Sequence, residues 1–255
     1  MDVDHILLTY CDDQPGVMWP RIARQISQGG KRLRPRLCLG SYQTYGGNDP
    51  NIVYVAAAWE MLHVGLLIHD DIMDGDYLRH GLPNIAGEQL LITGDARLAR
   101  NKALLAGDVC LSASYDLLHR SGFTDLYTIF QKSLEDVFEG QRMDVAGGFD
   151  PLEVARYKTA SYTYVGPLLS GAAAAGIVQL EHLQKAGEYK GIAYQLQNDI
   201  NDIAQDRKSG KQTAVIQAID DFGSEEVGVA MIKDLIAVYN HLAEREGFEP
   251  SMELP

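Results

Sequence analysis

The sequence predicts a single-domain, all-α protein: two observations predict the helices, and a third predicts the single domain. Apolar residues recur at helical rather than alternating spacing. β-Branched runs bounded by tight turns are nearly absent. No internal repeat or low-complexity linker divides the chain. We therefore expect residues 1–255 to form a single helical domain, with breaks where Gly, Pro and Asn cluster, at Gly29-Gly30, Gly46 to Pro50, Gly81 to Asn84, Gly147 to Pro151 and Gly223.

Three segments are predicted as helices with a role in the site. Residues 51–74 are apolar on every side until they end in acidic residues, which is typical of a helix at the centre of a bundle. Residues 187–206 form a second helix with an acidic end. Residues 157–178 form a third, in which Gly and Ala leave room for close helix packing or for a ligand.

The charge balance excludes one class of function. The chain carries 22 Lys and Arg against 35 Asp and Glu, a net charge of −13 with a pI near 4.9. A broad nucleic-acid-binding face is not expected, because a polyanion binds a positive surface. Cys11, Cys38 and Cys110 form no CxxC pair, which argues against a disulfide framework or a thiolate zinc site. The amino terminus is acidic where a signal peptide would be basic, so we expect a cytoplasmic protein that does not span a membrane.

The helix at 51–74 ends in HDDIMDGD, which predicts a metal site. Asp70 and Asp74 lie four residues apart on one face, with Asp71 beside them. Like charges at this spacing repel, so water or a cation must neutralise them. Mg²⁺ suits them best, because it binds carboxylate oxygens and keeps coordination sites open for phosphate. The alternative is an acidic helix end that faces solvent.

A second polar set follows one stripe of the helix at 187–206. It has steps of four, three and four residues and consists of Gln195, Asp199, Asp202 and Asp206, with Asn198 adjacent. If the two acid-ended helices face each other across a cavity, they form a polymetal site able to hold a diphosphate.

The basic counterpart is the segment GGKRLRPR, which carries Lys31, Arg32, Arg34 and Arg36. Glycines followed by a proline that can start a helix make an anion pocket from fixed charge and free backbone N–H groups. A basic surface turn is the alternative. Further candidate phosphate contacts are Arg79, His80, Lys158, Lys208 and Lys211.

His63 lies two helical turns before Asp70, on the same face of the helix. Taken alone, it is more typical of a hydrogen-bonded core histidine. Its position allows it to touch the ligand that Asp70 serves.

These motifs, in this order, resemble those of the trans-prenyltransferases, the polyprenyl diphosphate synthase family with the class I isoprenoid synthase fold. The matching segments are GGKRLRP, the ExxH of Glu60 to His63 running into LLIHDDIMD, the LRHG that follows, EGQRMD at Glu139 to Asp144, KTA at Lys158 and YQLQNDIND at Tyr194 to Asp202. An ordered set over residues 29–213 is far more specific than any one motif.

The resemblance implies an all-α bundle around a deep central cavity, Mg²⁺ as cofactor and a homodimer. The residues that match the family's metal-binding motifs are Asp70, Asp71, Asp74, Asp199 and Asp202. Those that match its diphosphate-binding groups are Arg79 and Lys158 for the allylic substrate, and Lys31, Arg34 and His63 for isopentenyl diphosphate, to which His80 is added by position. The expected catalytic residues are Asp70, Asp74, Lys158, Gln195 and Asp199.

The activity implied is that of a Mg²⁺-dependent, chain-elongating prenyltransferase of the geranylgeranyl type. The allylic diphosphate ionises to a carbocation, which the isopentenyl double bond attacks before a proton is lost. Water must be excluded, because it quenches the cation.

Three departures from the family pattern keep other functions open. His80 stands where the family usually has a second Arg, and Asn198 stands where the second motif usually opens with Asp. The stretch 206–211 is shorter than the usual metal-lid loop. The run Asn198, Asp202, Asp206 also has the spacing of the terpene cyclases' second metal motif. A terpene cyclase, or a prenyltransferase with another acceptor, is therefore the second hypothesis, and a non-catalytic partner subunit of a heteromeric synthase is the third.

Product length is predicted from the residues before the first aspartate. In the family, a bulky aromatic residue four or five positions before that aspartate stops elongation of the prenyl chain. Here those positions hold Leu66 and Gly65. We expect a product of about twenty carbons or more, with Met61, Leu62 and Ala58 next along the same face. On this placement, Gly65→Phe shortens the product.

Overall fold

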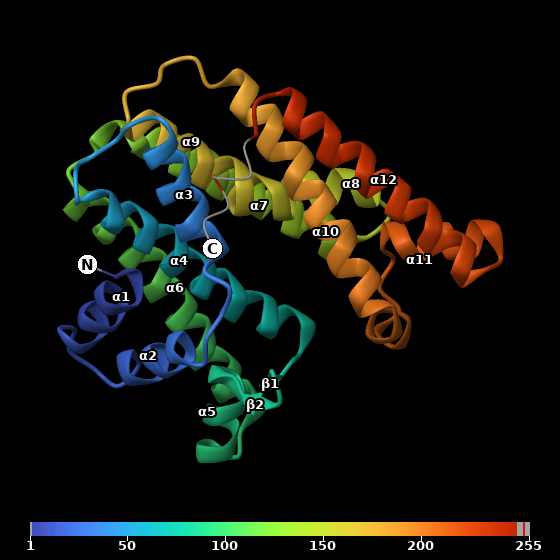
Figure 1. Ribbon diagram of the computed structural model, residues 1–255. Helices are drawn as coiled ribbons and strands as arrows, with labels where there is room; N and C mark the ends of the chain where they lie inside the picture. Colours follow the sequence, from blue (N-terminus) through green and yellow to red (C-terminus); the bar gives the residue numbers. More distant parts are fainter. Residues whose placement is uncertain (1, 249–251, 253–255) are drawn as a thin grey trace. The chain divides into compact units, whose positions relative to one another are not determined.

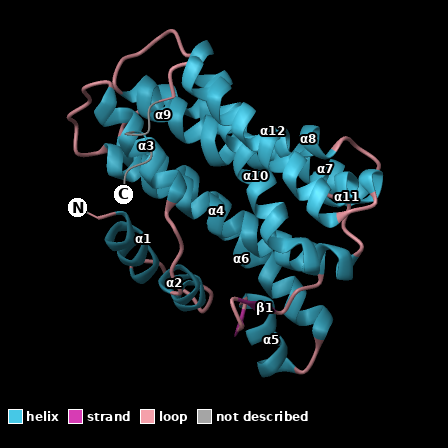
Figure 2. Cartoon of the chain, turned by 45° about the vertical axis from the view of Figure 1, so that its right-hand side comes forward, coloured by secondary structure: helices cyan, strands magenta, loops and turns pink. Residues whose placement is uncertain are grey.

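The computed structural model of the chain describes residues 2–248 and 252, and it is almost entirely helical (Figure 1). Among these residues, strands are confined to one short antiparallel hairpin (Figure 2). The all-α prediction is confirmed. The predicted breaks at 29–30, 46–50, 81–84, 147–151 and 223 all fall between helices.

The chain forms two compact units, each described here by itself. The first comprises residues 1–36 and 48–125, and the second comprises 37–47 and 126–255. The first holds α1 Val3–Asp12, α2 Trp19–Ser27, α4 Ile52–Asp74, β1 Leu78–Arg79, β2 Leu82–Pro83, α5 Ile85–Thr93 and α6 Ala96–Ser121. The second holds α7 Tyr127–Ala146, α8 Pro151–Val154, η2 Ala155–Val165, α9 Gly166–Ala174, α10 Glu181–Ser209, α11 Ala214–Phe222 and α12 Glu225–Arg245. Both α3 Leu33–Thr44 and the short η1 Thr124–Leu126 continue from one unit into the other. The single domain with a deep central cavity stays a prediction.

α4 is the central helix that the sequence predicts over 51–74. It ends at Gly75, whose φ of +74° suits glycine and whose N–H donates to the carbonyls of Asp71 and Ile72. By length and composition it could cross a membrane, but 72% of its most apolar window is buried inside the structure. Such burial is typical of a core helix.

Small residues bring α4 and α6 together in the first unit. A Cβ added to Gly65 would lie 3.0 Å from Cβ of Cys110 and 3.1 Å from the carbonyl oxygen of Gly107. On α6, Gly107 in turn leaves room for the ring of His69. This close approach buries the middle of α4, including Trp59, Met61 and Leu62.

The hairpin after α4 was not predicted as strand. His80 and Gly81 both have positive φ, +52° and +78°, which is the geometry of a two-residue hairpin turn. After it, Asn84 caps α5 by accepting from the N–H of Gly87, and its amide donates to the carbonyl of Asp76. The turn therefore returns the chain toward the acidic end of α4.

In the second unit, η2 lies against both α7 and α10. It is a π-helical stretch, a rare conformation that is frequent at functional sites. Cβ atoms at Gly140 and Gly191 would collide with the backbones of Lys158 and Ala160, so these glycines permit the close approach. The predicted helix 157–178 is thus two segments, η2 and α9.

The far end of this unit has its own apolar core, where α10, α11 and α12 meet (Figure 1). The buried residues of this core are Ile192, Leu196, Val215, Ile219 and Ile232. Ile192 and Leu196 lie on α10, on the side of the helix next to its polar stripe, so this packing helps to fix which way that stripe points.

Candidate active site

Three guanidinium groups act on His63 in the first unit. Desolvation and the charges of Arg34, Arg79 and Arg32 hold the pKa of His63 well below its ordinary value. The ring is therefore neutral near pH 7, and Arg34 beside it is buried. Concentrated positive charge of this kind is suited to binding an anion.

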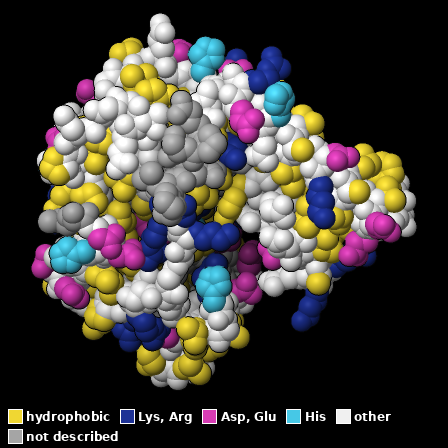
Figure 3. Space-filling view, in the orientation of Figure 1, with side chains coloured by type: hydrophobic (Ala, Val, Ile, Leu, Met, Phe, Trp, Pro, Cys, Tyr) yellow, Lys and Arg dark blue, Asp and Glu magenta, His cyan; other side chains and the backbone are white. Residues whose placement is uncertain are grey.

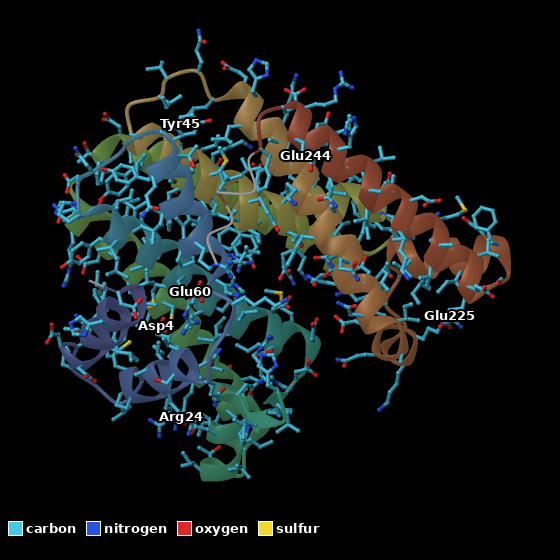
Figure 4. The ribbon with its side chains drawn as sticks, in the orientation of Figure 1. Asp4, Arg24, Tyr45, Glu60, Glu225 and Glu244 are labelled. Carbon is cyan, nitrogen blue, oxygen red and sulfur yellow. The ribbon has the colours of Figure 1, made fainter. Side chains whose placement is uncertain are left out.

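Besides its effect on His63, Arg32 anchors the loop before α3. Its φ is +47°, and its guanidinium pairs with Asp4 at 2.6 Å and with buried Glu60 at 2.9 Å (Figure 4). It also donates to the carbonyl of Ile26 at 2.7 Å. Glu60, the lone carboxylate in an apolar run, thus anchors the basic segment, whereas Lys31 is exposed.

At the acidic end of α4, Asp71 already has a cationic partner. Its Oδ1 lies 2.5 Å from Nη2 of Arg79, at the end of β1. Burial raises the pKa of Asp71 above its ordinary value, although Arg79 acts in the opposite direction. Asp70 is partly buried and Asp74 is exposed. His80 is exposed on the hairpin turn.

The second unit contains a cavity of about 260 Å³ that both apolar and polar residues line. The apolar lining residues, here named the apolar wall, include Met143, Phe149, Pro151, Val154 and Ala155. The polar lining residues, here named the polar wall, include Asp144, Lys158, Thr159, Gln195, Asp199 and Lys211. A cavity that combines apolar and charged lining residues is suited to an amphiphilic ligand that carries a charged head group.

Two groups of hydrogen-bonded side chains fix the conformation of the polar wall. Lys158 on η2 pairs with Asp144 on α7, with Nζ and Oδ2 2.5 Å apart. The hydroxyl of Thr159 donates to Oε1 of Gln195 at 2.6 Å, and the amide of Gln195 donates to Oδ1 of Asp199 at 2.6 Å. The second set fixes which end of the Gln195 amide faces Asp199.

Asp199 is the most perturbed carboxyl group of this wall. Burial raises its pKa to about 6, although the amide of Gln195 and the charge of Lys211 act in the opposite direction. Burial likewise raises the pKa of Asp206, which Lys211 partly offsets. Both carboxylates are therefore costly to keep charged, and a bound cation would relieve that cost.

The donors of both acidic sets fit a hard divalent cation. All are carboxylates, and Asp199 carries a burial cost that a cation would offset. In the described part of the chain, no three His, Cys, Asp or Glu side chains converge into a complete site. In proteins, Mg²⁺ usually takes one or two carboxylates and completes its shell with water and substrate phosphate.

The structure corrects the predicted position of the product-length residue. Gly65 faces the backbone of α6, where even a Cβ is tightly contacted. A phenylalanine there would overpack the α4–α6 contact rather than reach a substrate chain. The expectation that Gly65→Phe shortens the product is therefore wrong, and Leu66, which is partly exposed, is the better candidate.

Each unit brings together part of the predicted set. In the first unit, Arg34, His63, Asp71 and Arg79 form one electrostatic group. In the second, Lys158, Gln195 and Asp199 share the cavity, while Asp202 is exposed on α10. The sequence did not predict Asp144, Thr159 or Phe149 as site residues. The first two lie inside the EGQRMD and KTA segments, which was the available signal.

Known proteins resemble this chain in sequence and in fold. The sequence profile of the polyprenyl synthetases matches residues 19–233. The short chain isoprenyl diphosphate synthase of Methanothermobacter thermautotrophicus is 32% identical over 198 residues, covering 72% of this chain. The chain spans 58% of the length of that relative.

Two solved structures share the fold. The geranylgeranyl pyrophosphate synthetase of Geoglobus acetivorans has a TM-score of 0.79 at 25% identity, covering 98% of this chain and 93% of its own. The geranylgeranyl pyrophosphate synthase of Corynebacterium glutamicum, complexed with isoprenyl diphosphate and magnesium, has a TM-score of 0.76 at 24% identity, covering 96% and 85%.

Proposed function

Because the chain belongs to the polyprenyl synthetase family, we propose that it is a chain-elongating prenyltransferase that condenses isopentenyl diphosphate with an allylic diphosphate. The two-walled cavity of the second unit carries this proposal. Lys158 and Lys211 offer positive charge to a diphosphate, and the apolar wall suits the isoprenoid carbons next to it. The cations around His63 in the first unit offer a binding group for isopentenyl diphosphate.

In the proposed reaction, charged and polar side chains stabilise the charges that develop as bonds break and form. The C–O bond of the allylic diphosphate breaks, and the electron pair leaves with the diphosphate, which Lys158 stabilises. Oxygens of Thr159 and Gln195 stabilise the positive carbon, and the isopentenyl double bond supplies the electrons of the new C–C bond. A proton is then lost to the released diphosphate. Asp70, Asp71 and Asp74 in the first unit, and Asp199 and Asp202 in the second, would hold Mg²⁺, which would supply positive charge to neutralise the leaving diphosphate.

One incubation separates this function from its rivals. The protein is supplied with Mg²⁺, farnesyl diphosphate and isopentenyl diphosphate, and the products are analysed by mass. We expect a longer prenyl diphosphate that forms only when isopentenyl diphosphate is present. A hydrocarbon and diphosphate formed without it would instead indicate a terpene cyclase. No turnover by the chain alone would indicate a partner subunit of a heteromeric synthase.

We propose a product of about twenty carbons or more, since Leu66 has no aromatic ring that would block a longer prenyl chain. Leu66→Phe is expected to shorten the main product by at least one isoprene unit without lowering the melting temperature. Gly65→Phe is the matched control, which is expected to destabilise the protein by about 1–3 kcal/mol or more through overpacking. If Leu66→Phe gives products of unchanged length, Leu66 is not the residue that limits the length of the prenyl chain.

The proposed enzyme is a cytoplasmic homodimer. Large apolar side chains are exposed on α5 and α6, namely Leu91, Ile92, Leu98, Leu104 and Leu105. An apolar surface of this kind is typical of an interface. Elsewhere, the visible face carries scattered charges of both signs (Figure 3). Light scattering after size-exclusion chromatography is expected to give twice the chain mass of 28.1 kDa, and Leu104→Glu is expected to give the monomer.

A further inference from the structure

The connection between α7 and α8 places an aromatic ring at the rim of the cavity. Gly147 and Gly148 have φ of +68° and +78°, which lets the chain reverse after α7. Asp150 then caps α8 by accepting from the N–H of Leu152, and Pro151 begins that helix. Phe149, between these two fixed points, lines the cavity and is 38% exposed.

The ring of Phe149 is held from outside by a charged pair on α7. The guanidinium carbon of Arg142 lies 5.2 Å from the ring centroid, within the range of a cation–π contact. Arg142 is itself oriented by Glu139, to which its Nε and Nη2 donate at 2.8 and 2.6 Å. These two residues belong to the EGQRMD segment, and neither lines the cavity.

The loop after α10 is short. Gly210, Lys211, Gln212 and Thr213 border the cavity directly after α10, where the resemblance leads us to expect a longer loop. Because this loop supplies little chain to cover the cavity, the apolar ring of Phe149 is the group left to limit the access of water. An exposed apolar ring has a hydration cost, and lying over a cavity that binds an apolar chain would offset it.

We propose that Phe149 shields the reacting carbon from water, and that Glu139 and Arg142 hold it there as positioning residues. This inference rests on the proposed function. It assigns to Phe149 control over whether the allylic cation reacts with isopentenyl diphosphate or with water. Capture by isopentenyl diphosphate forms a C–C bond. Capture by water forms a C–O bond and an alcohol, with a proton released to the diphosphate.

The test measures partitioning rather than rate. The full chain is incubated with Mg²⁺, farnesyl diphosphate and isopentenyl diphosphate, and the ratio of farnesol to elongated product is determined. Phe149→Ala is expected to raise this ratio roughly fivefold or more, and because a ratio of products is measured, the result does not depend on the total consumption of farnesyl diphosphate. Phe149→Leu keeps an apolar side chain and is expected to fall between Phe149→Ala and the native protein.

Two variants decide whether the position of the ring matters. Arg142→Ala is expected to raise the farnesol ratio about twofold to threefold, because it releases the ring without changing the cavity lining. Phe222→Ala removes another exposed phenylalanine, which does not line the cavity, and it is expected to leave the ratio unchanged.

The outcomes separate this inference from the function on which it rests. If Phe149→Ala still elongates farnesyl diphosphate and its farnesol ratio equals that of Phe222→Ala, the shielding role is overturned and the prenyltransferase stands. If the native chain never consumes isopentenyl diphosphate, both are overturned. A melting temperature of Phe149→Ala within a few degrees of the native value confirms that the ratio reports on the folded protein.

Discussion

The acidic end of α4 and the polar stripe of α10 reduce the cost of buried carboxylates in different ways. Asp71 on α4 has an arginine of its own unit 2.5 Å away. Asp199 on α10 has an amide partner and a more distant lysine, and burial raises its pKa to about 6. One carboxylate thus has a cationic partner within the protein, whereas the other is left to gain from an added cation.

The comparison predicts different consequences for charge removal. At α4, taking away the cation should harm the folded protein, because it leaves a buried negative charge. At α10, taking away the carboxylate charge should help the folded protein and cost only function. The carboxylates of both helices are nevertheless expected to be needed for catalysis, and the loss of activity is expected to be larger than the change in stability.

Asp70→Asn is expected to lower kcat by about a thousandfold or more, because metal-assisted ionisation of the diphosphate loses one charged ligand. Asp76→Asn is the matched control, since this exposed carboxylate lies just beyond the helix. It is expected to retain nearly full activity. Comparable losses in both variants, measured as steady-state elongation in Mg²⁺, would contradict a specific metal role for Asp70.

Asp199→Asn is expected to stabilise the metal-free protein at pH 7. The folded-state pKa of about 6 lies above the ordinary value of 3.8, so the folded chain binds this proton more tightly and its stability falls as pH rises from about 4 to 6. The full cost at pH 7 is about 3 kcal/mol, at 1.36 kcal/mol per pKa unit. The asparagine removes the charge and keeps an acceptor for Gln195.

Urea unfolding in a chelating buffer checks this at two pH values. The stabilisation should approach its full size at pH 7 and nearly vanish at pH 3, where the native carboxyl group is mostly neutral in both the folded and the unfolded state. The same gain at both values would show that packing, rather than charge, is responsible. Added Mg²⁺ is expected to stabilise the native chain more than the variant.

Much of the fold and site follows from sequence pattern, and the failures have physical causes. Apolar periodicity located α4, and four-residue steps placed Asp199 on one stripe with Gln195. The direction in which Gly65 points depends on the small residues of α6, which no local pattern of α4 reveals. The π-helical path of η2 also depends on tertiary contacts, through Gly140 and Gly191.

The site residues that sequence did not predict depend on pairing. Asp144 and Thr159 act through partners on other elements, Lys158 and Gln195, so their roles appear only when the helices are assembled. Phe149 lies in a loop whose path is set by two left-handed glycines. Motif spacing identifies residues that share one helix face, but it does not identify pairs formed between helices.

Arg79→Ala tests the other half of the comparison and has the smallest expected effect. Removing the guanidinium leaves Asp71 buried without its cationic partner, and because Arg79 is itself 26% exposed, the expected loss is about 1–2 kcal/mol of unfolding free energy. Lys132→Ala breaks an exposed pair with Asp136 and should cost at most about 0.5 kcal/mol. Adding Asp71→Asn to Arg79→Ala should recover part of the loss, since the uncompensated charge is gone. If the double variant is less stable than Arg79→Ala, the buried charge of Asp71 is not the source of the cost, and the contrast with Asp199 fails.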